Sequence, residues 1–333
     1  SNYNYIILIM KITHLALSGG GMRGVIFVGA LRYLYIENLH KDITHIAGTS
    51  IGSIVGLALA LKLNIDEMED IIIKGNQDAK LCNIPYKNCI KIVTECGLSD
   101  VHIFSNYLKE FVKIKYPDIE ENITFSYLAK RFGINFYVSA TNIYTCKNKI
   151  FSLETTPDVC VFKACSASMA IPILFKPIKI NDDYYYDGGF TNNFPINIFD
   201  NVPYDNILGM ILYKSYYDKE IPDDQLPRPK ISFMFLSKQI IHLYEKIRTR
   251  SVLGELINVD KAEYYYIPNN IPDIPMMNIE INKKGLRLKL PEELFNSMIY
   301  AGYKSMSEYI IKRKKKNIEK NEKRYEIINV DYH

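Results

Sequence analysis

The stretch Gly48-Thr49-Ser50-Ile51-Gly52 has the G-x-S-x-G spacing of a nucleophile elbow, a tight turn from a strand into a helix. Its flanks fit that turn, because Ile43–Ala47 is short and mostly apolar and Ile54–Leu61 is almost wholly apolar. Such a turn lifts the Ser50 hydroxyl above the sheet, and the two glycines let strand and helix approach closely. The helix N-terminus then directs backbone N–H groups at negative charge forming near the serine. The stretch therefore predicts an acyl hydrolase.

A glycine-rich turn precedes this elbow. His14–Ser18 is typical of a strand, Gly19-Gly20-Gly21-Met22-Arg23-Gly24 follows it, and the apolar run Val25–Leu34 predicts a buried helix. Successive N–H groups in a glycine-rich turn between a strand and a helix form a concave site for an anion. That anion could be the tetrahedral oxyanion of an acyl transfer or the pyrophosphate of a nucleotide.

The pyrophosphate alternative is a dinucleotide-binding protein. The first, third and sixth residues of the turn satisfy G-x-G-x-x-G, and Glu37 and Asp42 lie at about the distance of a ribose-binding acid. Two observations weigh against this alternative. Arg23 puts a fixed positive charge inside the turn, which the dinucleotide fingerprint does not need. The next strand–helix unit also contains the serine elbow, so the oxyanion interpretation is favoured.

Two further blocks lie downstream. Asp187-Gly188-Gly189 is followed by Asn192-Asn193-Phe194-Pro195, and it is preceded by Ala167-Ser168-Met169-Ala170-Ile171-Pro172-Ile173-Leu174-Phe175-Lys176-Pro177. The four blocks, in this order, resemble the patatin-like phospholipase family, with its Gly-Gly-Gly-x-Arg-Gly, G-x-S-x-G, A-S-x-A-x-P-x-x-F-x-P and D-G-G motifs. The resemblance covers roughly residues 12–215. Ser18 stands where many members have an aspartate, and we expect little from that difference.

The resemblance implies a fold and a mechanism. The fold would be a modified α/β hydrolase, a three-layer α/β/α arrangement with a mostly parallel central sheet. Ser50 would be the nucleophile and Asp187 its general base, in a Ser–Asp dyad without histidine. A carboxylate is a weak base for a hydroxyl, so Asp187 would act through close contact together with oxyanion stabilisation. The oxyanion hole would consist of the backbone N–H groups of Gly20, Gly21 and Met22 in the glycine turn, with help from Arg23. The remaining motif glycines would shape the turns: Gly19, Gly24, Gly48, Gly52, Gly188 and Gly189.

The histidines are consistent with a dyad. Of the six, His14 and His45 lie on predicted core strands, where a structural role is expected. His242 is the only candidate by position for the third member of a triad, and its surroundings predict a helix, so it stays as an alternative. No histidine–cysteine cluster has the spacing of metal ligands, so we expect neither a metal nor another cofactor.

Composition sets the broad class. The chain has 333 residues, of which 48% are hydrophobic and 23% charged, as in a soluble globular protein. Its six cysteines contain no C-x-x-C pair, which predicts reduced thiols in an intracellular protein. No stretch is long enough to span a membrane, and Tyr5–Met10 lacks the basic region of a secretory signal. We expect a cytoplasmic protein, with peripheral membrane contact as an open alternative.

The chain is expected to divide into a catalytic core, residues 1–215, and a C-terminal extension packed on the same domain, residues 216–333. Pro291–Ile311 predicts an amphipathic helix, and the basic cluster Lys312–Lys316 follows as a tail. Such a cluster is usually solvated, but it could favour anionic lipid by about 1 kcal/mol per basic side chain. The apolar segment Phe233–Leu236 is a second candidate for membrane contact. The net charge of only +4 indicates no nucleic-acid partner.

These observations predict a lipid acyl hydrolase of the phospholipase A or lysophospholipase type. A soluble carboxylesterase or thioesterase is the main alternative, and a non-catalytic lipid-binding protein is a more remote one. Head group, acyl position and chain length depend on pocket walls that the motifs do not place. The expected partner is therefore a phospholipid or another acyl lipid.

Overall fold

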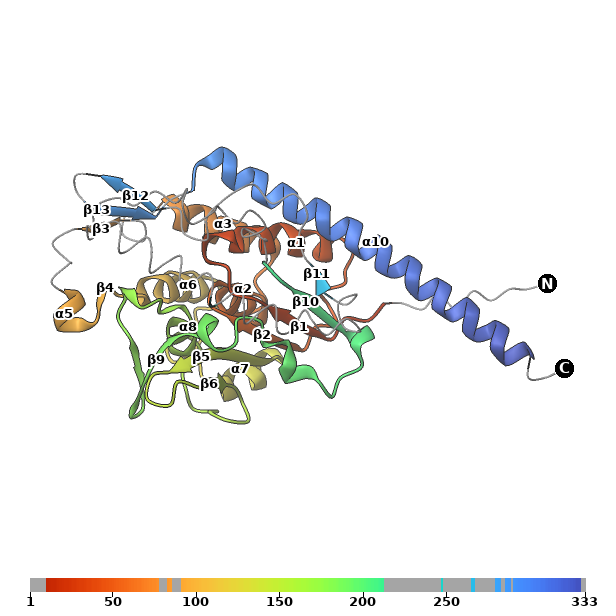
Figure 1. The fold of residues 1–333 in the computed structure, drawn as a ribbon, viewed down its shortest axis with the longest axis horizontal. Coiled ribbons are helices and arrows are strands. Elements are labelled where there is room, and N and C mark those ends of the chain that lie inside the picture. The colour runs from red at the N-terminus through yellow and green to blue at the C-terminus, as the bar shows by residue number, and fades with distance from the viewer. Residues whose placement is uncertain are drawn as a thin grey trace, which may run out of the picture.

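The computed structural model describes residues 10–77, 83–85, 91–212, 247, 265–266, 279–282, 285–288 and 290–330. At its centre is a sheet of eight strands in the order β11-β10-β1-β2-β5-β9-β8, with β6 also paired to β5 (Figure 1). The strands of this sheet are β1 (His14–Leu17), β2 (His45–Thr49), β5 (Asn135–Asn142), β6 (Asn148–Phe151), β8 (Ile178–Ile180), β9 (Asp183–Asp187), β10 (Ile207–Met210) and β11 (Tyr265–Tyr266).

The half of the sheet that contains the serine elbow is parallel. β1 pairs in parallel with β2 and β10, β2 pairs in parallel with β5, and β10 pairs in parallel with β11. Short apolar strands buried on both faces are typical of parallel sheets. The two strands that the sequence predicted before the glycine turn and before the elbow are present as β1 and β2, with ends shifted by up to two residues. The predicted α/β fold with a mostly parallel sheet is therefore confirmed.

The antiparallel half brings the D-G-G motif to the elbow. β9 runs antiparallel to β5 and places Asp187 opposite Ala140, while β2 places Thr49 opposite Ser139 on the other side of β5. Asp187 and the residue after Thr49 thus meet across a single strand. The other described strands form two smaller sheets, β12-β13-β3 and β4-β7: β3 (Asn83–Pro85), β4 (Gly97–Ser99), β7 (Ile173–Phe175), β12 (Ile279–Asn282) and β13 (Gly285–Leu288).

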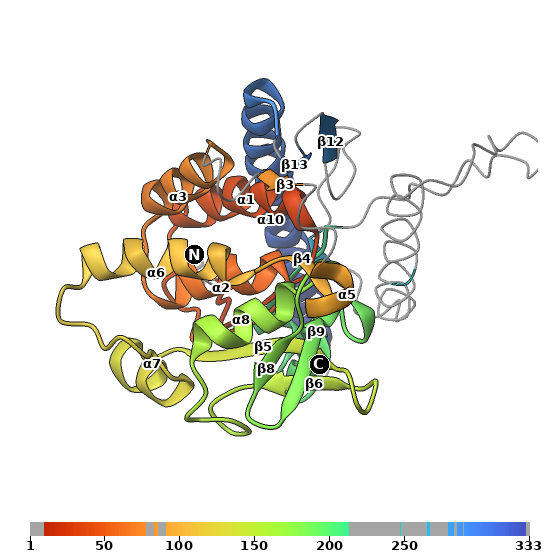
Figure 2. The same cartoon turned by 90° about the vertical axis from the view of Figure 1, so that its left-hand side faces the viewer.

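One face of the sheet is covered by helices. The crossovers from β1 to β2 and from β2 to β5 advance in the same direction, and right-handed crossovers of that kind place their helices on the same face. One large apolar cluster joins this face to the helices, which lie beside the sheet in Figure 2. They are α1 (Val25–Ile36), α2 (Ile51–Ala60), α3 (Ile65–Gln77), α6 (His102–Lys115), α7 (Phe125–Phe132) and α8 (Val161–Met169), with the short α5 (Lys91–Glu95) nearby.

The opposite face is covered, among the described residues, by the segment after the D-G-G motif. The 3₁₀ turns η3 (Gly188–Phe190), η4 (Pro195–Phe199) and η5 (Tyr204–Asn206) lead from β9 to β10. Phe194 and Phe199 pack there against Ala16 and Ala47, whose side chains alternate away from the helical face. The sheet is therefore buried on both sides beneath the motif.

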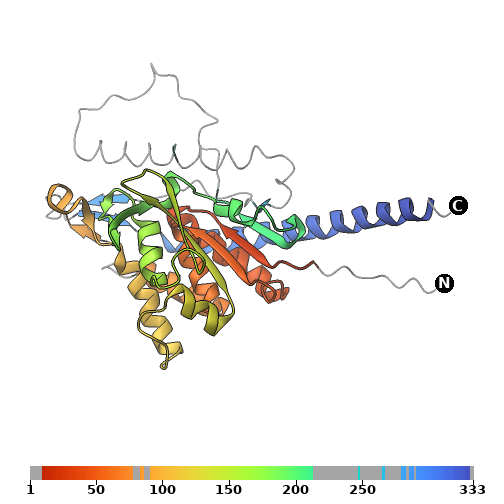
Figure 3. The same cartoon turned by 90° about the horizontal axis from the view of Figure 1, so that it is seen from below.

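The last helix, α10 (Glu292–Val330), lies along α1 and then extends beyond the rest of the described chain (Figure 1; Figure 3). A Cβ on Gly29 would lie 1.9 Å from the Ile299 carbonyl oxygen, and one on Gly302 would lie 2.2 Å from that of Ile26. The helix does not end at Ile311 as predicted, because it continues through the basic cluster. We find no helix in the described ranges with the length and apolar character needed to cross a bilayer.

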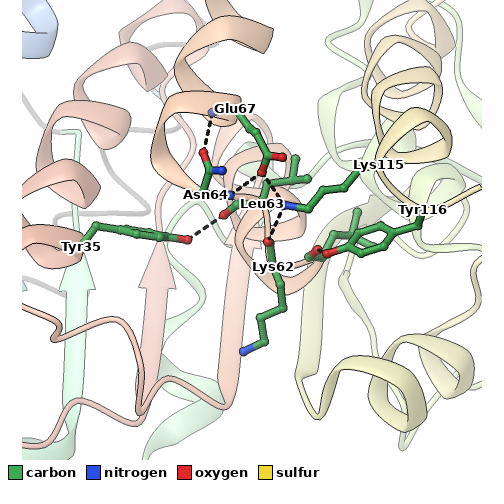
Figure 4. A network of polar contacts seen from close by, with 8 residues as sticks. Tyr35, Lys62, Leu63, Asn64, Glu67, Lys115 and Tyr116 are labelled. Atoms are coloured by element: carbon green, nitrogen blue, oxygen red, sulfur yellow. Dashed lines mark hydrogen bonds and ion pairs between the residues drawn. The ribbon is translucent and has the colours of Figure 1, made fainter.

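A polar network connects α1, α2, α3 and α6 on the helical side of the sheet (Figure 4). Asn64 and Glu67 form a reciprocal capping box at the start of α3, with distances of 2.7 and 2.9 Å. Lys115 on α6 binds the Glu67 carboxylate and donates to the Lys62 carbonyl oxygen. The Tyr35 hydroxyl on α1 donates to the Leu63 carbonyl oxygen at 2.7 Å. The turn that ends α2 is thus held from three neighbouring helices.

Candidate active site

Ser50 occupies the predicted turn between β2 and α2 in a strained conformation. Its φ is +53° and its ψ is −126°, a region that non-glycine residues rarely adopt and that costs about 1–3 kcal/mol. The strain follows from the tight turn. A Cβ on Gly48 would lie 2.6 Å from the Gly52 carbonyl oxygen, and one on Gly52 would lie 2.6 Å from that of Leu17. Only glycine fits at both positions, as the motif requires.

Ser50 and Asp187 meet in the core. The Ser50 hydroxyl donates to Asp187 Oδ2 at 2.7 Å, and the two residues are 137 positions apart in the sequence. Ser50 is 6% exposed and Asp187 is 0% exposed. The other carboxylate oxygen, Oδ1, accepts from the Gly189 backbone N–H at 2.7 Å. This second bond orients the carboxylate so that one oxygen faces the serine.

The backbone around Asp187 is fixed as well. The Asp187 N–H donates to the Ala170 carbonyl oxygen at 2.9 Å, and the Thr141 hydroxyl donates to the Asp187 carbonyl oxygen at 2.8 Å. A Cβ on Gly188 would lie 2.3 Å from the Ser139 carbonyl oxygen, so the D-G-G turn lies directly on β5.

The glycine turn lies against the elbow. A Cβ on Gly19 would lie 3.2 Å from Ser50 Cβ, and one on Gly24 would lie 2.2 Å from a side-chain carbon of Ile51. The turn continues as the 3₁₀ helix η1 (Gly21–Gly24), which Gly21 enters with a φ of +55°. The first N–H groups of a helix have no partner inside the helix and carry partial positive charge.

The other predicted residues of this turn are closely packed. Arg23 is 4% exposed, and Met22 packs partly buried against the main apolar cluster. A Cβ on Gly20 would lie 2.4 Å from a methyl carbon of Leu212. The structure therefore brings the two ends of the glycine turn, Gly19 and Gly24, against Ser50 and Ile51 of the elbow.

The acidic residues of the dinucleotide alternative lie elsewhere. Glu37 follows the last turn of α1, roughly 18 Å along the helix axis from the glycine turn at 1.5 Å per residue. Its carboxylate binds Lys314 on α10 at 3.0 Å. Asp42 is exposed before β2. This arrangement does not favour a nucleotide site.

The histidines of the described residues have other partners. His14 and His45 stack on each other with ring centroids 4.3 Å apart, and His40 stacks on Tyr35 at 3.7 Å. His102 binds the Ser166 hydroxyl at 3.1 Å. None of these four imidazoles forms a hydrogen bond with Ser50 or Asp187. His242, the predicted alternative, lies outside the described residues, as do His333 and Phe233–Leu236.

Sequence reasoning missed the hydroxyl groups that support the pair. Ser168 was only part of a motif, yet its Oγ accepts from the Ser50 backbone N–H at 2.8 Å and donates to the Ser139 carbonyl oxygen at 2.5 Å. The Ser53 hydroxyl donates to the Ser50 carbonyl oxygen at 2.6 Å. The sequence signal that could have found Ser168 was its place next to apolar residues in the motif, since a buried hydroxyl needs a hydrogen-bond partner.

Comparison with known proteins identifies relatives of this arrangement. A probable lipid hydrolase of Invertebrate iridescent virus 6 is 37% identical over 187 residues, which cover 55% of this chain and 62% of the viral protein. An uncharacterized protein of Acanthamoeba polyphaga mimivirus is 27% identical over 303 residues, covering 91% and 95%. A cGAMP-activated phospholipase of Escherichia coli is 28% identical over 204 residues, covering 56% and 54%. The chain thus spans less than two thirds of the iridescent virus and bacterial relatives.

The fold has a similar solved structure. The crystal structure of VipD from Legionella pneumophila has a TM-score of 0.56 and 16% identity, covering 91% of this chain and 67% of that chain. At that identity the likeness concerns the fold. The family model described as patatin-like phospholipase matches residues 15–200, more than half of the chain, which include all four motif blocks. The chain therefore belongs to the patatin-like phospholipase family.

Proposed function

We propose that this protein hydrolyses carboxylic esters of lipids through an acyl-enzyme on Ser50, with Asp187 as the general base. The observation that carries the proposal is the 2.7 Å hydrogen bond from Ser50 Oγ to Asp187 Oδ2 in a buried site. A nucleophile within hydrogen-bonding reach of a base that a third group orients is the arrangement of covalent catalysis. Here the backbone N–H of Gly189 is the orienting group.

The first half-reaction forms the acyl-enzyme. Ser50 Oγ attacks the ester carbonyl carbon while its proton moves to Asp187 Oδ2. The carbonyl oxygen becomes an oxyanion, which the N–H groups of Gly20, Gly21 and Met22 would stabilise together with the positive charge of Arg23. The carbon–oxygen bond to the alcohol then breaks, and the departing alkoxide takes the proton from Asp187.

The second half-reaction releases the acid. Water attacks the acyl carbonyl carbon and gives a proton to Asp187, and the oxyanion forms again in the same site. The bond to Ser50 Oγ breaks, and the serine recovers its proton from Asp187. Because Asp187 is a weak base, most of the rate enhancement must come from donors aimed at the oxyanion.

The lipid nature of the substrate rests on the family and on two relatives. The iridescent virus protein is named a probable lipid hydrolase and the bacterial one a phospholipase. We infer a phospholipase A or lysophospholipase activity for this chain. A soluble carboxylesterase or thioesterase would use the same site and differs only in the substrate.

Contact with an anionic membrane surface would rest on α10. Within the basic cluster, four lysines are exposed: Lys312, Lys314, Lys315 and Lys316. Arg313 is 5% exposed, and its guanidinium donates to the carbonyl oxygens of Tyr204 and Asp205 at 3.3 and 3.0 Å. Lys314 binds Glu37 at the end of α1 at 3.0 Å. The other three lysines therefore offer charges to a lipid surface, while the arginine holds α10 against η5.

The test combines a short p-nitrophenyl ester with a long-chain phospholipid in vesicles. Wild type should hydrolyse both, and Ser50→Ala should hydrolyse neither while keeping its melting temperature. A fluorophosphonate probe should label wild type at Ser50 and leave the alanine variant unlabelled. Turnover of the ester alone would support the soluble esterase. If Ser50→Ala keeps a substantial part of the wild-type turnover, the proposed function is wrong.

A further inference from the structure

The strained backbone of Ser50 is held at both of its polar atoms. On one side, its N–H donates to Ser168 Oγ at 2.8 Å. On the other, its carbonyl oxygen accepts from Ser53 twice, from the backbone N–H at 2.8 Å and from the hydroxyl at 2.6 Å. A conformation that costs about 1–3 kcal/mol persists only where its surroundings enforce it. These contacts are the ones that enforce it here.

Among these hydrogen-bonding groups, the Ser168 hydroxyl is the one that lies outside the elbow. Ser168 lies on α8 and is 0% exposed. Its oxygen accepts from the Ser50 N–H, and its O–H donates to the Ser139 carbonyl oxygen on β5 at 2.5 Å. A hydroxyl has one proton to donate, so this second bond fixes its rotation and leaves a lone pair directed at Ser50.

The end of α8 also holds the other member of the pair. Ala170, the C-cap of this helix, accepts the Asp187 N–H at 2.9 Å. Two residues of one short segment thus contact the backbone of the proposed nucleophile and of the proposed base. The segment therefore sets the separation between Ser50 and Asp187, whose side chains meet at 2.7 Å.

We propose that Ser168 is a positioning residue for the hydrolysis, fixing the Ser50 backbone so that Oγ faces both Asp187 and the substrate carbonyl. The inference rests on the proposed function. It also has a consequence for the oxyanion hole. Since the Ser50 N–H already donates to Ser168, the donors to the oxyanion must be other groups, which agrees with the proposed hole of Gly20, Gly21 and Met22.

The experiment compares two buried serines on the same helix in the full chain. Ser168→Ala removes the contact with Ser50, and Ser166→Ala is the matched control. Ser166 is also 0% exposed, and its hydroxyl binds the Phe162 carbonyl oxygen, Ser105 and His102. Both changes remove a buried hydroxyl, so both should lower the melting temperature similarly.

Kinetics on a short soluble ester separate positioning from stability. Displacing a reacting group by about 1 Å costs on the order of 10²-fold, so kcat of Ser168→Ala should fall by up to that factor with KM unchanged. Labelling by a fluorophosphonate should slow in proportion. Ser166→Ala should keep the wild-type kcat, and Ser168→Thr, which retains a hydroxyl, should recover most of the loss.

The outcomes distinguish this inference from the function on which it rests. An active Ser50→Ala variant would reject the proposed function itself. If Ser50→Ala is inactive but Ser168→Ala matches Ser166→Ala in kcat, the positioning role is overturned. Should Ser168→Ala fail to fold, Ser168→Cys takes its place against Ser166→Cys. Its weaker acceptor should still lower kcat, and equal kcat in the two cysteine variants would overturn the inference.

Discussion

Asp187 is a residue whose chemistry can be changed with almost no change of shape. Asp187→Asn replaces one carboxylate oxygen by an NH2 group and leaves no group that can take the Ser50 proton, so kcat should fall by at least the ~10²-fold typical of general-base loss. The melting temperature should change little, because the amide oxygen can still accept from the Gly189 N–H while the NH2 group faces the Ser50 hydroxyl oxygen. Initial rates of hydrolysis of a soluble ester at saturating concentration would measure the change in kcat.

Histidine variants are the control for that prediction. His102→Ala removes a bond to Ser166 and should leave kcat close to wild type. His242→Ala should do the same. A loss with His242→Ala as large as the loss with Asp187→Asn would replace the dyad with a triad.

Gly19 gives a second prediction at the residue scale. In Gly19→Ala the new Cβ would lie 2.4 Å from Asn193 Oδ1 and 3.2 Å from Ser50 Cβ, so the turn must move relative to the nucleophile. We expect the rate of fluorophosphonate labelling to fall by tenfold or more, toward the ~10²-fold that a 1 Å displacement costs.

Gly133→Ala is the matched glycine control. Gly133 has a φ of +69° and no atom within 4 Å of an added Cβ. This variant should lose about 1 kcal/mol of unfolding free energy through backbone strain, measured in urea, and keep the wild-type labelling rate. Normal labelling of Gly19→Ala would contradict the close contact between turn and nucleophile.

Strand pairing places two histidines face to face at the start of β1 and β2. Burial, followed by the nearby charge of His45, lowers the pKa of His14 to about 4. Burial also lowers the pKa of His45, although the nearby Glu154 carboxylate partly raises it again. An unfolded chain has both near 6.5. Between pH 6.5 and about 4 the unfolded state therefore binds protons that the folded state does not.

The free energy of unfolding should accordingly fall as the pH falls through that window, and these histidines should contribute no pH dependence above it. Melting temperatures measured from pH 7 to 4 check this. The double variant His14→Asn/His45→Asn retains every carboxylate, so the difference between the two curves isolates the histidines. Parallel curves for wild type and the double variant would refute the prediction.

Element boundaries show what local sequence could predict. The strand and helix around Ser50 follow from apolar runs, and their existence was predicted correctly. The predicted end of the C-terminal helix at Ile311 was wrong, because α10 continues to Val330. No glycine or proline occurs from Tyr303 to Val330, so the sequence contains no helix stop there, and the basic cluster was mistaken for one. The burial of Arg313 depends on η5, a partner more than one hundred positions away.

Site prediction was limited in a similar way. The motif blocks predicted which residues gather, and the structure brings them together, but their catalytic roles stay predictions. Ser168, Ser53 and Thr141 could not be assigned, because their partners depend on strand register rather than on neighbouring residues. The proposed boundary at residue 215 also stays a prediction, since much of the chain between 213 and 289 is outside the described residues.

At the scale of the whole molecule, α10 provides the test of membrane contact. Replacing Lys312, Lys315 and Lys316 by glutamine should weaken binding to anionic vesicles, by about 1 kcal/mol for each side chain at the surface. Wild-type binding should also weaken with salt, since exposed charges are screened within about 8 Å at physiological ionic strength. Hydrolysis of vesicles should fall, while hydrolysis of a short ester should not change.

Arg313 and Lys314 are left unchanged in that experiment, because Arg313 contacts Tyr204 and Asp205 and Lys314 binds Glu37. Arg313→Gln alone is a control, which should lower the melting temperature without changing the salt dependence of vesicle binding. If the three-lysine variant hydrolyses vesicles at the wild-type rate, the basic cluster of α10 has no part in lipid contact.

The packing of α10 on α1 also has a consequence for synthesis. Glu37 and Lys314, which join the two helices, are 277 positions apart. At roughly 5–20 residues per second, the ribosome needs ~15–55 s to make the chain between them. During that interval α1 has left the ribosome, but the surface around Gly29 that α10 later covers is still exposed. Nascent chains halted before residue 292 should therefore bind chaperones, although all four motif blocks have already been translated.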